Sequence, residues 1–393
     1  MKRKLGQYMT PYEVCALLVR KVTEHYEDIV DLTAGDCGLL KAFSDVNPNA
    51  SVTGIDVDSE ILQIGQQNLP KANLTLADGL EYDLPLRISP RLYVANPPYG
   101  ISSNVSLAAD ASLKSAFPNL KTTKGRNRLE IQFLAKYLNL IQEGDKLVIV
   151  LPTSFADGDT YKEYRKILMN HYTVTSAIEF SADIFEKTEA KTVALIISVK
   201  TQSEPSSVEI SRFNYGCLSD QLVFSGELIN GERLDAKFYS GNDWSACTTL
   251  EELGVNIARG RHSNKQASRL ELIPIHTSDL SKSVNGTIRI PNFKANRDYM
   301  RREKDTFAQA GDILLSRTGK RVSWNPVMVV SGVAPITDHV FRIRISERHR
   351  KVALESFRSP RFQDWLNAVC KGVCATVLTK QDLMKMPIFS LAS

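Results

Sequence analysis

The sequence lacks the features that would place a protein in a membrane, outside the cell or around a metal ion. No apolar run approaches the roughly 18 residues that a membrane-spanning helix needs. The first residues are basic, but no apolar segment follows them, so we expect no secretory signal. The 6 cysteines are scattered and form no Cys-x-x-Cys motif. We therefore expect a cytoplasmic protein with reduced thiols, no bound metal and no membrane partner.

The sequence also lacks the glycine patterns that hold nucleotide phosphates. Gly35 and Gly38 do not form a Gly-x-Gly-x-x-Gly motif, and the Lys-Ser/Thr pair of a phosphate-binding loop is missing. A nicotinamide or nucleoside triphosphate site is therefore disfavoured. Apolar residues, in contrast, are plentiful: they make up 43% of the 393 residues. This is enough for two globular domains, each with its own core.

The most informative stretch is the tetrapeptide Asn96-Pro97-Pro98-Tyr99, which follows the apolar run from Leu92 to Ala95. Its two prolines fix φ and remove two backbone N–H donors, so the turn is stiff and offers acceptors. Asn96 adds a side-chain carbonyl and Tyr99 a flat ring. An exocyclic amine on a heteroaromatic ring needs that set, namely acceptors for both hydrogens and a face for stacking. The alternative is an ordinary proline-rich turn at the end of a strand.

Polar groups end each of four successive apolar segments. The segments are 28–31, 51–58, 72–77 followed by Asp78, and the run that ends at Asn96. Small residues follow the first segment, where a backbone would have to approach a ligand closely. Asp56 arrives 25 residues after Asp31, near the position at which Rossmann-like sites hold ribose hydroxyls. Ligands of open α/β sheets bind beyond the carboxyl ends of the strands, so we expect a site there.

The remainder of the first half continues as alternating helices and strands. Apolar spacing predicts helices over 129–141 and 161–168, and apolar runs predict strands over 146–152, 174–180 and 192–199. We expect an α/β fold, with a Rossmann-like sheet over residues 1–230. A second, smaller α+β domain is expected over residues 231–393, where short strands, polar turns and basic residues replace the earlier pattern.

Taken in order, these motifs resemble those of gamma-class N6-adenine DNA methyltransferases of the TaqI type. The resemblance spans nearly the whole chain and begins with the run Gly6 to Pro11. It continues through the turn at Gly35, the acidic residues at 56 and 78, and the tetrapeptide. One departure lies in the turn, which usually contains Gly-x-Gly and here reads Gly35-Asp36-Cys37. A Cβ at Cys37 is therefore expected to crowd the methionine part of the cofactor.

The resemblance implies a methyltransferase sheet that binds S-adenosylmethionine and acts on double-stranded DNA. In this assignment Asp56 holds the ribose and Asp78 holds the adenine of the cofactor. The positions that the resemblance assigns to cofactor binding are Tyr8, Thr10, Pro11, Asp31, Thr33, Gly35, Asp56, Val57, Asp78, Gly79 and Asn96.

The same resemblance implies a catalytic site for a flipped-out adenine. Asn96 Oδ1 and the Pro97 carbonyl would accept the two N6 hydrogens, while Tyr99 stacks on the base and Pro98 completes the turn. Flipping the base costs a few kcal/mol, part of which stacking returns. Family members place a phenylalanine on the other face of the base, and Phe185 occupies that position. A place in the core is the alternative for Phe185, because phenylalanine is often buried.

Charge is divided unevenly between the two halves. Residues 1–230 hold 23 Lys and Arg against 28 Asp and Glu, whereas residues 231–393 hold 26 against 16. The basic second half suggests contact with a polyanion. This half resembles the target recognition domains of type I specificity subunits and TaqI-like enzymes, in its segments 311–319 and 378–388.

Basic residues in three places are predicted to contact DNA. The first is the loop 121–128, the second is the basic Gly turn that ends the segment 311–321 after a predicted strand, and the third is the strand 338–345. This last strand alternates apolar and basic residues, which predicts one core face and one cationic face. The predicted contacts are Lys124, Arg126, Arg128, Arg317, Lys320, Arg321, Arg342 and Arg344. For each of them, a solvated surface charge is the alternative.

Two other functions remain open at this point. Methylation of RNA or of a protein glutamine is one, because Asn-Pro-Pro-Tyr also serves such amines and amides. A non-enzymatic DNA-binding specificity module with a decayed methyltransferase half is the other, and Cys37 is its only support. A restriction endonuclease on a separate chain is one partner that a modification role allows. We expect the chain to act as a monomer in catalysis.

Overall fold

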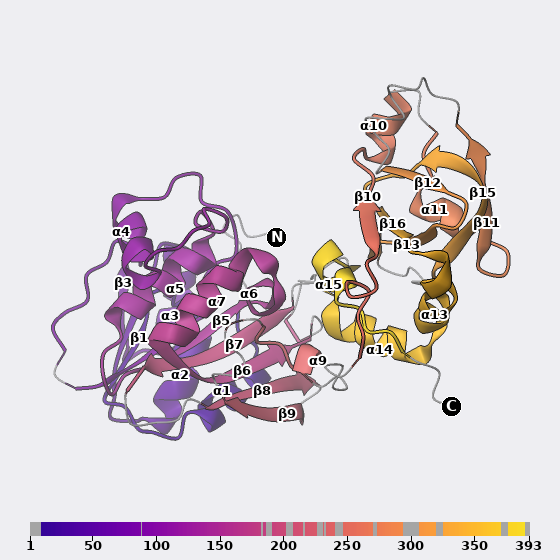
Figure 1. The fold of residues 1–393 in the computed structure, drawn as a ribbon. Coiled ribbons are helices and arrows are strands. Elements are labelled where there is room, and N and C mark those ends of the chain that lie inside the picture. Colours follow the sequence, from indigo (N-terminus) through magenta and orange to yellow (C-terminus); the bar gives the residue numbers. More distant parts are fainter. Residues whose placement is uncertain are drawn as a thin grey trace. The chain divides into compact units, whose positions relative to one another are not determined.

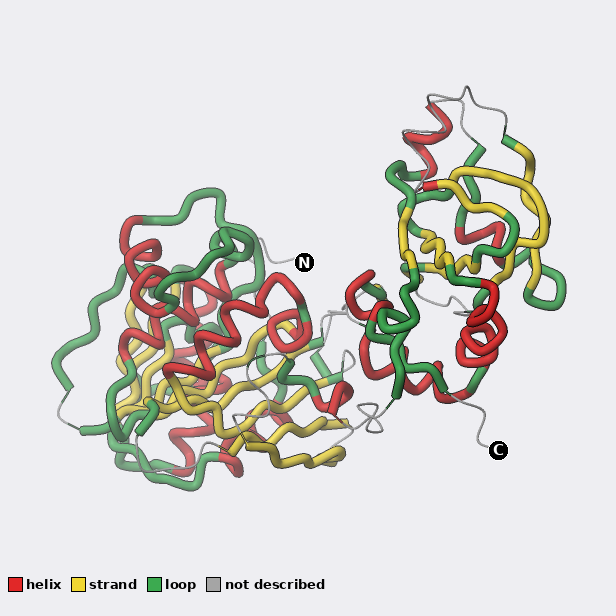
Figure 2. Tube along the Cα trace, in the orientation of Figure 1, coloured by secondary structure: helices red, strands yellow, loops and turns green. Residues whose placement is uncertain are grey.

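Two compact units make up the chain, Met1–Ala236 and Lys237–Ser393. The computed structural model (Figures 1 and 2) describes residues 9–87, 89–181, 184–185, 191–201, 207–214, 217–225, 231, 233–239, 247–269, 273–293, 306–319, 325–370 and 376–389. The units divide after Ala236, beyond the expected boundary at residue 230. Leu234 N still donates to Ala156 O at 3.0 Å, and Ala236 N donates to Glu179 Oε2 at 3.1 Å. These bonds hold the connecting segment on the first unit.

A nine-stranded sheet forms the centre of the first unit, in the order β3-β2-β1-β4-β5-β7-β6-β8-β9. Its strands are β1 (Asp28–Asp31), β2 (Ser51–Asp56), β3 (Asn73–Leu76), β4 (Arg91–Ala95), β5 (Lys146–Pro152), β6 (Tyr172–Phe180), β7 (Thr192–Val199), β8 (Ser207–Asn214) and β9 (Cys217–Ser225). Strands β1 to β5 run parallel to one another, and β7 lies antiparallel between β5 and β6. The carboxyl ends of the first four strands therefore meet at one edge.

Helices cover both faces of this sheet. They are α1 (Tyr12–Lys21), α2 (Gly38–Val46), α3 (Ser59–Asn68), α4 (Leu107–Ala116), α5 (Leu129–Leu140), α6 (Thr153–Asp157), the 3-10 turn η1 (Asp159–Tyr161) and α7 (Lys162–His171). Successive side chains of a strand point to opposite faces. Leu92 and Val94 of β4 accordingly pack in the core with residues of α1 and α2. Tyr93 points to the other face, where its ring contacts that of Tyr137 of α5 edge-on, with the ring centroids 5.9 Å apart.

The second unit is built on a smaller sheet with the order β10-β16-β13-β15-β11, in which β12 also pairs with β15. Its strands are β10 (Asn256–Arg259), β11 (Thr287–Asn292), β12 (Phe307–Gln309), β13 (Ile313–Ser316), β15 (Val327–Pro335) and β16 (Val340–Arg344), with β14 (Thr318–Gly319) and β17 (Thr376–Val377) forming a separate pair. Its helices are α10 (Asn264–Arg269), α11 (Thr277–Leu280), α13 (Glu347–Arg358), α14 (Pro360–Val369) and α15 (Lys380–Met384), and α9 (Ala236–Tyr239) spans the division between the units.

Two separate cores lie on the two faces of the smaller sheet. Ile313 and Leu315 of β13 pack with Phe357 of α13 and Trp365 of α14 in one cluster. Leu314, between them in sequence, belongs to a second cluster on the opposite face. Successive side chains of β13 thus point to opposite faces of the sheet, and both faces are buried.

The expected α/β class, with a second, smaller unit, is confirmed. Strands β5 and β7 cover the predicted ranges 146–152 and 192–199, and α5 covers all but the last residue of the predicted helix 129–141. No helix in the described part of the chain is long and apolar enough to cross a membrane.

Candidate functional site

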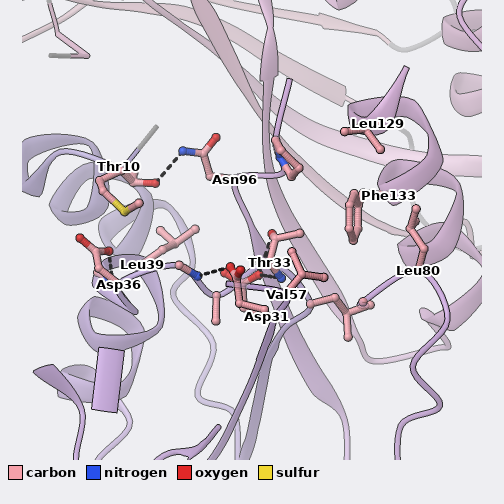
Figure 3. A pocket seen from close by; sticks show the side chains of 18 of the residues that line it. Thr10, Asp31, Thr33, Asp36, Leu39, Val57, Leu80, Asn96, Leu129 and Phe133 are labelled. Carbon is pink, nitrogen blue, oxygen red and sulfur yellow. Dashed lines mark hydrogen bonds between the residues drawn. The ribbon is translucent and has the colours of Figure 1, made fainter. Parts of the chain in front are cut away.

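A cavity of about 230 Å³ lies at the carboxyl edge of β1 to β4, where the predicted site residues converge (Figure 3). It is lined by Met9, Thr10, Asp31, Leu32, Thr33, Ala34, Gly35, Asp36, Gly38, Leu39, Asp56, Val57, Asp78, Gly79, Leu80, Asn96, Pro98, Leu129 and Phe133. All residues predicted to bind the cofactor are among them except Tyr8, which lies outside the described residues, and Pro11. Pro11 instead precedes α1 as its N-cap residue, in an extended conformation.

Four aspartates line this cavity, and the most buried of them is Asp31, which is 2% exposed. Its Oδ1 accepts hydrogen bonds from Thr33 N at 2.7 Å and Thr33 Oγ1 at 2.9 Å. Burial raises the pKa of Asp31 to about 7, and the nearby carboxylate of Asp56 adds to the rise. The bonds from Thr33 act in the opposite direction. A cation in the cavity would therefore favour the ionised form.

Asp56 joins two backbone turns at the floor of the cavity. Its Oδ2 accepts from Gly35 N and its Oδ1 from Asp58 N, each at 2.9 Å. Burial raises the pKa of Asp56 above its ordinary value. Each carboxylate oxygen has two lone pairs, so hydroxyl donors can still bind the sides that face the cavity.

Asp78 is exposed at the rim, unlike Asp31 and Asp56, which are buried. Its Oδ1 accepts from Leu80 N at 2.9 Å and so fixes the turn that follows β3. Gly79 lies inside that turn, where an added Cβ would come 2.1 Å from Leu32 O. The close backbone approach, rather than contact with a ligand, is what requires glycine at this position.

The Asn96 amide lies at the cavity between two hydroxyl groups. Asn96 Nδ2 donates to Thr10 Oγ1 at 3.1 Å, and Tyr99 Oη donates to Asn96 Oδ1 at 3.2 Å. Figure 3 shows Thr10 and Asn96 linked in this way above the carboxylates. The turn after β4 thus presents an amide whose orientation is fixed from the N-terminal segment and from its own tyrosine.

An apolar wall faces the aspartates across the cavity, and sequence reasoning missed it. Leu80, Leu129 and Phe133 form this wall, and Figure 3 shows them together on the side away from Thr10 and Asp36. Leu129 and Phe133 are four positions apart on α5, so they share one helix face. That spacing is visible in the sequence, but it shows only that the face is apolar, not which surface it meets.

Cys37 does not crowd the cavity, contrary to expectation. Its side chain is buried and is not among the lining residues. The backbone at Cys37 adopts a left-handed φ of 63°, and the thiol lies against α3. A Cβ added at Gly65 of α3 would come 2.7 Å from Cys37 Sγ. A small residue on α3 therefore makes room for the cysteine.

Phe185 is not at the cavity either. It is 2% exposed and packs in the main core, with its ring 6.2 Å from that of Phe180. The prediction that it lies against a target base is thus wrong for this conformation, and the core alternative holds. Burial among apolar side chains of β6 and β8 explains this position, because Phe180 also contacts Phe213.

The basic loop before α5 contains the first group of predicted DNA contacts. Lys124 is exposed, whereas Arg126 is ion-paired with Asp110 of α4. Arg128 is half-buried as the N-cap residue of α5. Of these three predicted contacts, Lys124 is therefore the exposed one.

The two arginines of β16 that were predicted to contact DNA instead form hydrogen bonds within the second unit. Arg342 is 1% exposed and donates to Asn256 Oδ1 of the neighbouring strand. Arg344 donates to both carboxylate oxygens of Asp312, at 2.7 and 2.8 Å. The prediction of an exposed cation is therefore wrong for Arg342, which is buried, whereas the Arg344 side chain stays 37% exposed but is paired with Asp312. Arg317 is partly exposed, and Lys320 and Arg321 lie outside the described residues.

Comparison with known proteins identifies the first unit. The sequence model of N-6 DNA Methylase matches residues 1–213, which include every residue of the cavity. The chain belongs to the N-6 DNA methylase family. Across the described residues, no three His, Cys, Asp or Glu side chains gather as a metal site would need.

Solved structures agree with this membership at the level of the fold. The present chain is 16% identical to the type IIG restriction endonuclease BpuSI, with a TM-score of 0.50. The alignment covers 99% of the present chain and 59% of BpuSI. A type I restriction-modification methyltransferase subunit from Streptococcus thermophilus shares 19% identity over 59% of each chain, with a TM-score of 0.48. The M protein of the type I restriction enzyme EcoKI shares 15%, over 66% of this chain and 60% of its own, with a TM-score of 0.41.

The present chain thus spans about three fifths of the length of these proteins. The alignment with BpuSI covers 99% of this chain and so includes residues of both units.

Proposed function

We propose that the chain is a site-specific DNA methyltransferase that transfers a methyl group from S-adenosylmethionine to N6 of a flipped-out adenine. The observation that carries this proposal is the Asn96 amide, held by Thr10 and Tyr99 at the cavity of a member of the N-6 DNA methylase family. Relatives in fold belong to restriction-modification systems. A modification role beside a separate restriction endonuclease is consistent with them.

The charges and the apolar wall of the cavity support S-adenosylmethionine as the cofactor. Bound S-adenosylmethionine would supply an electrophilic methyl carbon on a sulfonium, whose sulfur becomes neutral once N6 has taken the methyl group. Asp31 and Asp56 provide the negative charge that a sulfonium and ribose hydroxyls require. Leu80 and Phe133 provide an apolar surface for a flat ring, with the carboxylate of Asp78 at the rim for its amine.

The tetrapeptide after β4 would position the target amine. Asn96 Oδ1 can accept a second hydrogen bond beside the one from Tyr99, because an amide oxygen has two lone pairs. This bond and one to the Pro97 carbonyl would hold both N6 hydrogens and direct the nitrogen lone pair toward the methyl carbon. Methylated N6 would then lose one of its two hydrogens as a proton to solvent, and Asn96 Oδ1 would keep the amine in place throughout. Catalysis here depends on positioning, which is worth several kcal/mol.

The second unit would read DNA in this account. Its excess of Lys and Arg over Asp and Glu, 26 against 16 in residues 231–393, favours a polyanionic partner. Base flipping needs the duplex to be held on both sides of the target, and contacts to phosphates supply that grip.

A methyl-transfer assay on three substrates tests the proposal. The full chain is incubated with tritium-labelled S-adenosylmethionine and with random-sequence duplex DNA, with RNA or with a protein extract. We expect label in DNA, and N6-methyladenine after digestion to nucleosides. Asn96→Ala should lower transfer by orders of magnitude with S-adenosylmethionine binding nearly unchanged, whereas Asn104→Ala, at an exposed asparagine in the following loop, should transfer normally.

The outcomes separate this function from its rivals. Label confined to RNA or to protein glutamine would assign the chain to another substrate. Tight, specific DNA binding without any transfer would favour a non-enzymatic specificity module. Full activity of Asn96→Ala would exclude the role of the amide.

A further inference from the structure

Several cations of the second unit lie at one end of its sheet. Strand pairing places Arg259, the last residue of β10, opposite Phe341, and Ser316, the last residue of β13, opposite Val340. Strands β10 and β13 therefore end where β16 begins. Arg317, which follows β13, and His339, which precedes β16, meet at this end.

Hydrogen bonds hold these side chains in fixed positions. Arg317 N donates to His339 O at 2.8 Å, and Thr318 Oγ1 lies 2.7 Å from His339 Nδ1. The ring of His276 meets that of His339 edge-on, with centroids 5.8 Å apart, and its Nδ1 lies 2.9 Å from Thr337 Oγ1. The two imidazoles are thus ordered beside the backbone of Arg317.

A glycine brings two more arginines to the same place. Gly260 N donates to Thr337 O at 3.2 Å, and a Cβ at Gly260 would come 1.8 Å from Ile336 O. Only glycine allows this approach, and it brings the backbone of Arg259 and Arg261 against the loop before β16. Both arginines are exposed.

The cluster carries more positive than negative charge. We define it as Arg259, Arg261, His276, Arg317 and His339. Burial lowers the pKa of Arg317 below its ordinary value, and the positive charge of Arg259 lowers it further. Two carboxylates lie nearby: Asp338 Oδ1 is 3.7 Å from His339 Nε2, and Asp279 is itself paired with Lys282 at 2.8 Å. Asp338 offsets part of this repulsion, and a bound anion would offset more of it.

We propose that this sheet-end cluster binds phosphates of the DNA backbone and thereby places the second unit on the duplex. The proposal rests on the proposed function, because it takes duplex DNA as the substrate. Guanidinium groups bind phosphate oxygens in pairs through two parallel N–H bonds, and histidine N–H groups add further donors. Contacts of this kind fix the register on DNA and carry no sequence information themselves.

Salt dependence of DNA affinity tests the cluster. Each phosphate contact contributes about 0.9 to the slope of log affinity against log salt. The full chain with Arg259→Gln and Arg317→Gln together should bind duplex DNA more weakly, with a slope shallower by about 2. Arg348→Gln is the matched control. It removes one exposed charge from α13, which follows the opposite end of β16, and should leave the slope unchanged.

Two further measurements keep the outcome decisive. S-adenosylmethionine affinity, a property of the first unit, should be the same in all variants. Since Arg317 also donates to Asp338 O at 3.5 Å, Arg259→Gln alone provides a test if the double variant unfolds; it should lower the slope by about 1. If folded variants that methylate DNA keep the same slope of log affinity against log salt, the role of the cluster in phosphate binding would be refuted and the proposed function would stand. A lowered slope in a chain that never methylates adenine would do the reverse.

Discussion

Affinity for S-adenosylmethionine should depend on pH through Asp31. Burial raises the pKa of this carboxyl to about 7 in the free protein, against an ordinary value near 3.9. With that pKa, about ten elevenths of the molecules carry an ionised Asp31 at pH 8, and about one eleventh at pH 6. If the cationic cofactor requires the carboxylate, its affinity should fall about tenfold between pH 8 and pH 6.

The direction of the effect on folding is opposite. A carboxyl with a raised folded-state pKa binds more protons when folded than when unfolded, so the free energy of unfolding falls as pH rises from about 4 to about 7. Bound cofactor should reduce this loss, because it favours the ionised form. Thermal unfolding at about pH 4 and about pH 7, with and without S-adenosylmethionine, would show whether the cofactor reduces the loss of stability.

Calorimetric titration of S-adenosylmethionine at pH 6 and pH 8 is the direct assay. Asp31→Asn is the control, because an amide oxygen can still accept from Thr33 N but cannot ionise. This variant should bind weakly at both values, with little pH dependence. An equal affinity of the parent at pH 6 and pH 8, or an undiminished pH dependence in Asp31→Asn, would refute the reasoning.

Two further predictions concern the floor of the cavity and the packing of Cys37 against α3. Asp56→Ala should weaken S-adenosylmethionine binding by about 1.5–3 kcal/mol, since it also releases Gly35 N; Asp58→Ala, which removes only the cap of α3, should lower thermal stability with little loss of affinity. Equal calorimetric affinities for both variants would place the ribose elsewhere. Gly65→Ala should lower the unfolding free energy by about 1–3 kcal/mol, because its Cβ would meet Cys37 Sγ at 2.7 Å. Adding Cys37→Gly should recover part of that loss in denaturant unfolding, and no recovery would exclude the contact as its cause.

The sequence predicts the framework of the site because that framework depends on local rules. Polar residues after parallel strands must meet at one edge of the sheet, whatever packs above them. Asp31, Asp56, Asp78 and Asn96 therefore line a single cavity, as their order along the chain predicts. The apolar wall was missed because the face that α5 presents depends on tertiary packing.

Predictions that require a particular partner were the ones that were wrong. Alternation of apolar and basic residues along a strand shows that the basic side chains share one face of the sheet, not that this face is exposed to solvent. Arg342 lies on such a face and is buried against the neighbouring strand. Phe185 has the position of a base-stacking residue in the family pattern, yet its ring packs in the core. The direction of the Cys37 side chain follows from a left-handed backbone and from a glycine on another helix, neither of which a local pattern reveals.

Mapping of methylated bases in DNA is the most direct test of the central claim. DNA from cells that express the full chain would be sequenced for N6-methyladenine, beside DNA from cells that express Asn96→Ala at the same level. The account predicts N6-methyladenine at one short recognition sequence with the parent chain, and its loss with the variant. An absence of N6-methyladenine with the folded parent chain, or an identical pattern with Asn96→Ala, would contradict it.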